Sequence, residues 1–180
     1  MPDAVRARRV MPGVRRLLVV YVMKAKYPFL PKSSQRLTPG DFWAIPLMDG
    51  SFGCGVVLEL HPKGIPGSKV AFLAGLLNWH DMSPPTSEAL AGSRTLEQGV
   101  AHILAITQTG GEVLGNRQLV LDGIEPWFFV DGDVIRKGFT RLRKWKQQDA
   151  GCYPAFSWWS YDVIQIYANK HLLGYMPSRA

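Results

Sequence analysis

Residues 39–58 read PGDFWAIPLMDGSFGCGVVL, and this stretch decides the fold. Two apolar runs, 42–47 and 52–60, flank the dipeptide Asp49-Gly50. Asp-Gly is a strong hairpin signal because it can supply positive φ at both central positions of a tight turn. The stretch therefore predicts two antiparallel strands that begin a β-sheet.

The rest of the chain is read as mostly strands. Strands are predicted at 69–79, 100–107, 112–121, 126–130, 159–168 and 171–175, and a short helix at 87–91. The spacing of Ile135, Phe139, Leu142 and Trp145 predicts a second helix. Because no long helices alternate with strands, a parallel βαβ fold is excluded. The expected class is mainly β (β-rich α+β): a curved antiparallel sheet or partial barrel with one or two short helices.

The chain of 180 residues is long enough for one domain with an extension. Residues 1–37 are expected to form a basic N-terminal arm and linker, within which 14–23 could be a first strand. Residues 38–180 are expected to form a single domain.

The net charge of +7 is unevenly distributed. Residues 1–26 hold seven basic side chains and one acidic one, and residues 136–146 hold six basic side chains and no acid. Residues 27–135 hold six basic and eleven acidic side chains. The charge therefore indicates a local basic patch on an acidic body, which weakens a whole-protein argument for nucleic-acid binding.

Cys54 and Cys152 lie far apart and form no Cys-x-x-Cys pair, so neither a disulfide framework nor a structural zinc site is expected. No run approaches the roughly 18 apolar residues of a membrane span. The short apolar run 17–23 follows basic residues, as in a secretory signal, but no small-residue cleavage site follows it. We expect a cytoplasmic protein without a membrane partner.

Residues 39–58 resemble the opening hairpin of the immunity protein 26 family of bacterial polymorphic toxin systems. The shared pattern is a Gly-Asp pair, an apolar strand ending Ile-Pro-Leu, an Asp-Gly turn and an aromatic–Gly–x–Gly strand. Residues 113–119 are similar to a second, weaker feature of the family. The resemblance covers roughly residues 38–130 and implies a non-enzymatic protein, without a cofactor, that neutralises a cognate toxin domain by binding it.

The residues that carry this motif have a structural interpretation. Glycines serve turns and bulges, and a proline marks a strand edge or bulge. We expect the motif to form scaffold rather than toxin contacts at Gly40, Asp41, Pro46, Asp49, Gly50, Gly53 and Gly55.

Partner binding is instead expected where charge and aromatic side chains coincide. Trp, Tyr and Arg dominate binding hot spots. The candidate residues are Arg136, Lys137, Arg141, Arg143, Lys144, Trp145, Trp158 and Trp159. The same basic segment could instead bind nucleic acid, which is the alternative function, or be a solvated helix face, and the two tryptophans could simply pack under a loop.

Catalytic chemistry has little support in the sequence. The four histidines form no metal motif, and 131–133 lacks the ligands of a calcium loop. His80 beside Asp81 could be a general base, and Cys54 or Cys152 a nucleophile, which keeps a hydrolase as a third class. No metal site is expected.

Overall fold

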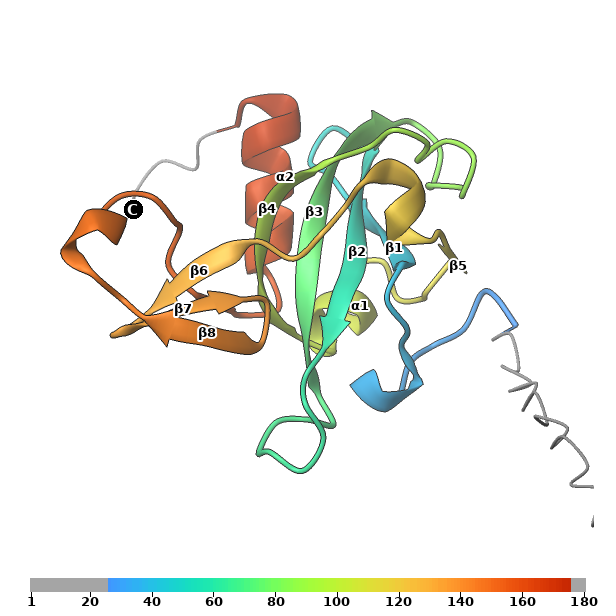
Figure 1. Ribbon diagram of the computed structural model, residues 1–180. Coiled ribbons are helices and arrows are strands. Elements are labelled where there is room, and N and C mark those ends of the chain that lie inside the picture. The colour runs from blue at the N-terminus through green and yellow to red at the C-terminus, as the bar shows by residue number, and fades with distance from the viewer. Residues whose placement is uncertain (1–25, 176–180) are drawn as a thin grey trace, which may run out of the picture.

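The computed structural model describes residues 26–175, which form two β-sheets and two α-helices (Figure 1). Most of the predicted basic arm, including the possible strand at 14–23, lies outside these residues. The fold is β-rich and mostly antiparallel, and its sheets do not close into a barrel, which confirms the expected class. None of its helices is both long and apolar enough to cross a membrane, among the residues described.

The predicted hairpin is present as β1 (Asp41–Pro46) and β2 (Phe52–Leu60). The two strands pair antiparallel from Phe42 opposite Val56 to Pro46 opposite Phe52. Gly50 has φ +87°, but Asp49 does not reach positive φ, so the connection is a three-residue loop rather than a two-residue turn. The Leu47 amide closes this loop by donating to the Ser51 carbonyl oxygen at 2.9 Å.

The larger sheet has the order β5-β1-β2-β3-β4-β9. Its other strands are β3 (Ala71–Asp81), β4 (Thr95–His102), β5 (Gly115–Asn116) and β9 (Trp158–Trp159), and only β9 runs parallel to its neighbour. The β2–β3 register shifts between Gly53 and Gly55, which confirms the predicted bulge.

This sheet is buried on both faces. Alternate residues of each strand point to opposite faces. Trp43, Val57 and Phe72 belong to one buried cluster, whereas Phe42, Val56 and Leu73 belong to another. A strand covered on both sides reads as a continuous apolar run, which is why β2 and β3 show no polar alternation in the sequence.

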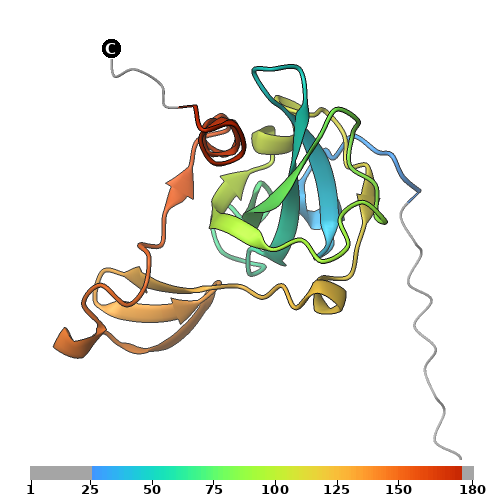
Figure 2. The same ribbon diagram turned by 90° about the horizontal axis from the view of Figure 1, so that it is seen from above.

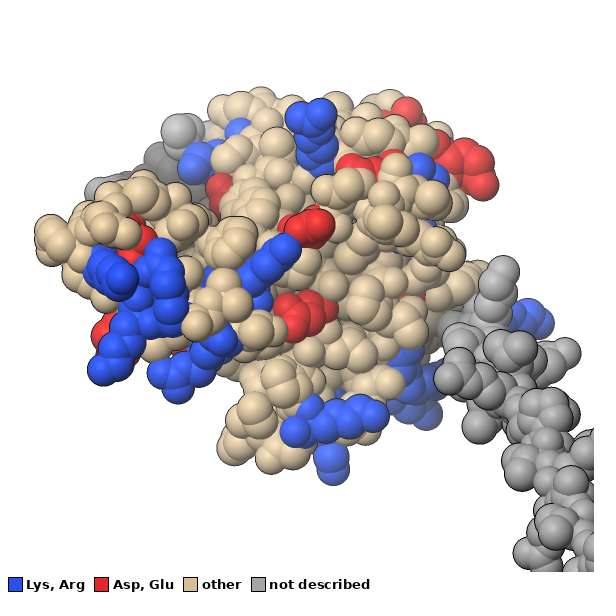
Figure 3. Space-filling model, in the orientation of Figure 1, with Lys and Arg blue, Asp and Glu red and all other residues tan. Residues whose placement is uncertain are grey.

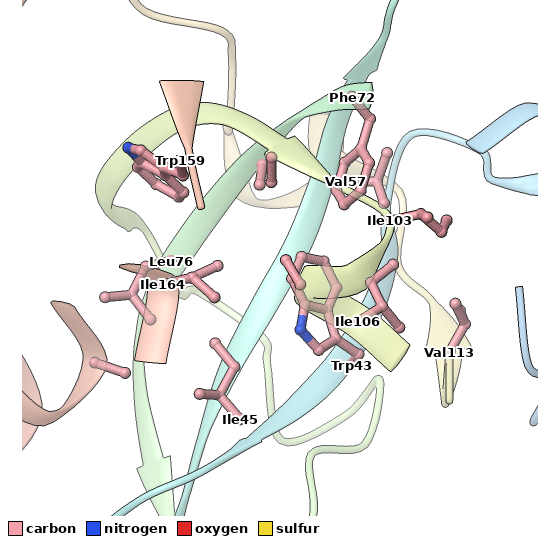
Figure 4. Close-up of a cluster of buried hydrophobic side chains, with 14 of the residues drawn as sticks. Trp43, Ile45, Val57, Phe72, Leu76, Ile103, Ile106, Val113, Trp159 and Ile164 are labelled. Carbon is pink, nitrogen blue, oxygen red and sulfur yellow. The ribbon is translucent and has the colours of Figure 1, made fainter. Parts of the chain in front are cut away.

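Two helices cover one face: α1 (Leu104–Thr107) and α2 (Val163–Leu173). Ile106 of α1 and Ile164 of α2 enter the same cluster as Trp43 (Figure 4). A Cβ on Gly53 would lie 2.8 Å from the Leu172 side chain, so this glycine makes room for α2.

The second sheet is formed by β6 (Phe128–Asp131), β7 (Val134–Lys137) and β8 (Thr140–Lys144) in that order. It stands beside the larger sheet (Figure 2) and joins the second buried cluster through Phe129 and Phe139. Three short 3₁₀ turns complete the structure: η1 (Ser34–Arg36), η2 (Leu119–Asp122) and η3 (Gln147–Asp149). Residues 27–37, read from the sequence as a linker, pack on the body: Leu37 is buried, and Phe29 pairs with Val113.

The helix predicted at 135–145 is wrong, because this segment is the β7–β8 hairpin. Gly138 has φ +54°, which interrupts any helix and suits the first central position of a type II′ turn. The β-branched residues Val134, Ile135 and Thr140 also favour strands. The helical spacing of the four apolar residues was coincidental.

The strands predicted at 159–168 and 171–175 are also wrong beyond β9, because residues 163–173 form α2. Ile164 and Ala168, four residues apart, are its buried contacts, and Gly174 ends it in the left-handed region. Packing against the larger sheet, which no local pattern encodes, selects the helix here.

Three further elements differ from the prediction. Residues 87–91 form turns rather than a helix. The strand expected at 100–107 begins at Thr95 and gives way to α1 after His102. The strand expected at 112–121 is reduced to β5, which is followed by η2.

Candidate functional site

The β7–β8 hairpin, which carries the basic segment, is fixed to the larger sheet by Glu59 of β2. The Phe139 amide donates to Glu59 Oε2 at 3.0 Å. A Cβ on Gly138 would displace the same carboxylate, and the φ of +54° at this position favours glycine. Burial raises the pKa of Glu59 above its usual range, and the Phe139 amide offsets part of that rise.

Replacing Glu59 by glutamine is expected to change how stability depends on pH. A raised pKa means that the folded protein binds the Glu59 proton more tightly than the unfolded chain. The stability that this tighter proton binding contributes is fully present below the ordinary pKa of 4.5. It is lost as the pH rises through the pKa of Glu59 in the folded protein. Glutamine keeps an acceptor for Phe139 without ionising.

Urea unfolding of both proteins between pH 4 and 7 measures this effect. As the pH rises, the free energy of unfolding of Glu59→Gln should increase relative to that of the wild type, because the two proteins share every other titrating group. Parallel curves would show that Glu59 titrates alike in the folded and unfolded chains.

Three of the six basic residues of this segment are paired with acids. Arg136 contacts Asp131 at 2.7 Å and lies over the ring of Phe156, and Lys137 contacts Glu125 at 2.6 Å. Arg143 binds Asp149 through both guanidinium nitrogens, at 2.6 and 2.7 Å. The Arg143 hydrogen bonds lower the pKa of Asp149 to about 2, so this pair persists into strong acid.

The other three cations are free to meet a partner. Arg141, Lys144 and Lys146 are exposed, and none has an ion pair with any acid among residues 26–175. Basic side chains gather over the three-stranded sheet on one side of the molecule (Figure 3). The predicted patch is thus a smaller set of free charges than the sequence indicates.

The two adjacent tryptophans have different environments. Trp159 is buried: its ring occupies the place where a Cβ of Gly99 would lie, and it packs edge-on against Tyr167. Trp158 is 61% exposed and lies with its ring centroid 6.0 Å from that of His61. Trp145, the third candidate, is half-buried.

Trp158 borders a shallow pocket of about 200 Å³ between the loop after β2 and the segment before β9. Ile65, which is half exposed, lines the same pocket as Trp158, together with Arg136 and Phe139 of the hairpin. The structure therefore brings the exposed tryptophan and the basic hairpin to one surface. A second, open groove of about 750 Å³ lies on the other side of the hairpin, lined by Trp127, Phe128 and Tyr153 among others.

The motif residues Gly40 and Asp41 lie away from this surface, in a buried network. The Asp41 carboxylate accepts hydrogen bonds from the Tyr27 hydroxyl (2.6 Å), the Thr38 amide (2.9 Å) and the Asn116 side chain (2.9 Å). A Cβ on Gly40 would overlap the Arg117 carbonyl. These residues hold the start of β1 against β5.

Pro46 and Gly55 also lie in the sheet. Pro46 ends β1, and its carbonyl accepts a hydrogen bond from Gln165 of α2 at 2.8 Å. The indole of Trp43 covers Gly55, its direct cross-strand partner. Such aromatic cover compensates for the missing glycine side chain.

A serine, a histidine and an aspartate meet at the β1–β2 loop. Ser51 Oγ lies 2.7 Å from His80 Nε2 and donates a hydrogen bond to Asp49. In a nucleophilic triad the hydroxyl and the carboxylate contact different imidazole nitrogens. Here both face Nε2, and Ser51 is buried, so the group braces the loop instead of activating a nucleophile.

Sequence reasoning missed several residues that shape the surface. Glu59, Glu125 and Asp149 lie outside the basic segment, and only the fold brings their carboxylates to it. The many cations of the segment indicated that acidic side chains should lie nearby. They did not indicate which acidic residues these would be. No group of three or more potential metal ligands occurs in the described part of the chain.

Comparison with known proteins gives one match. The family model described as immunity protein 26 matches residues 38–141, from just before β1 into β8. No curated protein and no solved structure matches the chain. Because the matched region covers more than half of the sequence and includes both sheets' principal strands, this chain belongs to the immunity protein 26 family.

Proposed function

We propose that this protein neutralises a cognate toxin domain by binding it directly, as a stoichiometric inhibitor without catalytic activity of its own. The observation that carries the proposal is the family match over residues 38–141. Cys54 and Cys152 are both free thiols, which suits action in the reducing cytoplasm. The toxin is the expected partner, and no cofactor takes part.

The proposed docking surface combines the exposed Trp158 with the free cations Arg141, Lys144 and Lys146. A desolvated aromatic anchor supplies most of the affinity of a typical interface. Free charges at the rim orient the partner and speed its encounter. Trp158 and all of β8 after Arg141 lie beyond the family match, where a chain can differ from its relatives to suit its own toxin.

The alternative is nucleic-acid binding through the same cations. Each phosphate neutralised adds about −0.9 to the slope of log affinity against log salt on double-stranded DNA. Arg136, Lys137 and Arg143 already neutralise acids of this chain, which leaves few charges for a phosphate track. The pairing therefore favours an acidic protein partner.

Co-expression tests the proposal. A cognate toxin domain expressed alone is expected to stop growth, and co-expression of this protein is expected to restore it. Titration of the purified toxin domain should saturate at one molecule of inhibitor for each toxin. Growth arrest that persists with this protein at full expression would contradict the immunity function.

A further inference from the structure

The outer strand of the small sheet, β8, is exposed along its whole length. All five of its residues are exposed, whereas β6 and β7 each contain buried ones. Exposure of every second residue would mean one free face. Exposure of every residue means that neither face is closely covered over this strand, and the sheet order places it at an edge.

Each face of the small sheet is partly covered by the segment that follows β8. Residues opposite one another on paired strands share a face. The face of Phe129, Arg136 and Arg141 is covered by Phe156, which contacts the first two. The opposite face, with Phe128 and Arg143, is covered by the segment after β8 through the Phe128–Tyr153 and Arg143–Asp149 contacts.

The outer backbone edge of β8 pairs with no described strand, although its Lys144 carbonyl accepts a hydrogen bond from Arg143 Nη1 at 3.1 Å. The far edge of β6 is occupied, because Val130 exchanges hydrogen bonds with Pro154 and Phe156 at 2.9 and 2.8 Å. Within residues 26–175 the edge strands of the larger sheet, β5 and β9, are only two residues long. On its outer side β8 pairs with no strand of the described structure along its five residues.

The charges on this edge select what can pair with it. Arg141 and Lys144 have no ion pair with a described acid, and Lys146 follows them. A second copy of this strand would place like charges together, which is how natural edges avoid self-association. An acidic strand would instead form opposite-charge cross-strand pairs.

We infer that β8 receives an extended acidic segment of the toxin domain as an additional strand of the small sheet. Backbone hydrogen bonds would give affinity, and pairs with Arg141 and Lys144 would give specificity. The β7–β8 register shift leaves Leu142 as an extra, half-exposed residue, which offers one apolar contact between the two cations. This inference rests on the proposed function and specifies how the toxin is held.

The test uses the full-length protein and the toxin domain that it neutralises in the co-expression experiment. Hydrogen exchange of residues 140–144 is expected to slow by about tenfold or more when the toxin domain is bound, since outward amides become hydrogen-bonded. The double variant Arg141→Glu/Lys144→Glu is expected to weaken binding by about 30-fold, because attractive pairs become repulsive. The matched control Lys26→Glu/Lys32→Glu makes the same charge change on exposed lysines elsewhere and should bind normally.

The outcomes separate the two proposals. Tight binding without slower exchange in β8 would overturn strand addition and leave the immunity function standing. The same holds if the double variant, shown to be folded by its thermal melt, binds like the control. Failure of the unaltered protein to bind the toxin domain, or binding of a single-stranded oligonucleotide in its place, would overturn both.

Discussion

Replacing Asp41 by alanine is expected to lower the free energy of unfolding by about 3 kcal/mol. The carboxylate is almost fully buried and accepts hydrogen bonds from Tyr27, Thr38 and Asn116. Alanine would remove the acceptor that these donors share. Tyr27 and Asn116 are half-buried, so water replaces the carboxylate only in part, and an unmet buried donor costs more than an average hydrogen bond contributes. Urea unfolding followed by tryptophan fluorescence measures the loss.

Two milder variants separate the carboxylate from its partners. Tyr27→Phe removes one donor and should cost about 1 kcal/mol. Asp41→Asn keeps one acceptor oxygen but turns an amide group toward other donors, so its cost should lie between the two. An Asp41→Ala protein as stable as the wild type would mean that the Gly-Asp pair of the family motif is not needed for the fold.

The opening hairpin could be predicted because its signals are local. Residues 42–47 and 52–60 are apolar runs on either side of Asp-Gly, and strands of nearly these bounds are present. The bulge predicted from Gly53 is also present. What the local reading could not supply is the reason for Gly53 itself, which is the Leu172 side chain of α2, about 120 residues away in the chain.

The β7–β8 hairpin was predicted as a helix and α2 was predicted as strands, and both errors have the same physical reason. Each segment is short, with a pattern that fits both periods, and tertiary contacts decide between them. The Glu59 carboxylate of β2 lies beside Gly138 and accepts a hydrogen bond from the Phe139 amide in the turn, while the larger sheet gives Ile164 and Ala168 a surface to cover. Both contacts join residues far apart in sequence.

The candidate surface was located by sequence but not resolved in detail. The density of charge around Arg141 and the adjacent tryptophans predicted a surface patch, and Arg141 and Trp158 are exposed. That a partner binds there stays a prediction. Which cations are neutralised depends on Glu125 and Asp149, and which tryptophan is exposed depends on Gly99. These contacts depend on the fold, so the distribution of charged and aromatic residues along the chain does not predict them.

The two neighbouring tryptophans are expected to respond to alanine in opposite ways. Trp159→Ala removes a buried ring from its place over Gly99, leaves a cavity, and should cost about 3–5 kcal/mol of stability. Trp158→Ala removes a ring that is 61% exposed and should change stability by less than about 0.5 kcal/mol. Thermal and urea unfolding of the two variants test this contrast.

For toxin binding, unlike stability, we expect Trp158 to matter more than Trp159. If Trp158 is the anchor of the docking surface, Trp158→Ala should weaken toxin binding by about 30-fold or more, the effect of a hot-spot residue. Met82→Ala is the matched control, because Met82 is 70% exposed at the distal end of the larger sheet. Calorimetric titration of the toxin domain into each folded variant measures the difference. Equal affinities for Trp158→Ala and Met82→Ala would place the anchor elsewhere, and the pocket between Trp158 and Ile65 would then be an unused feature of the surface.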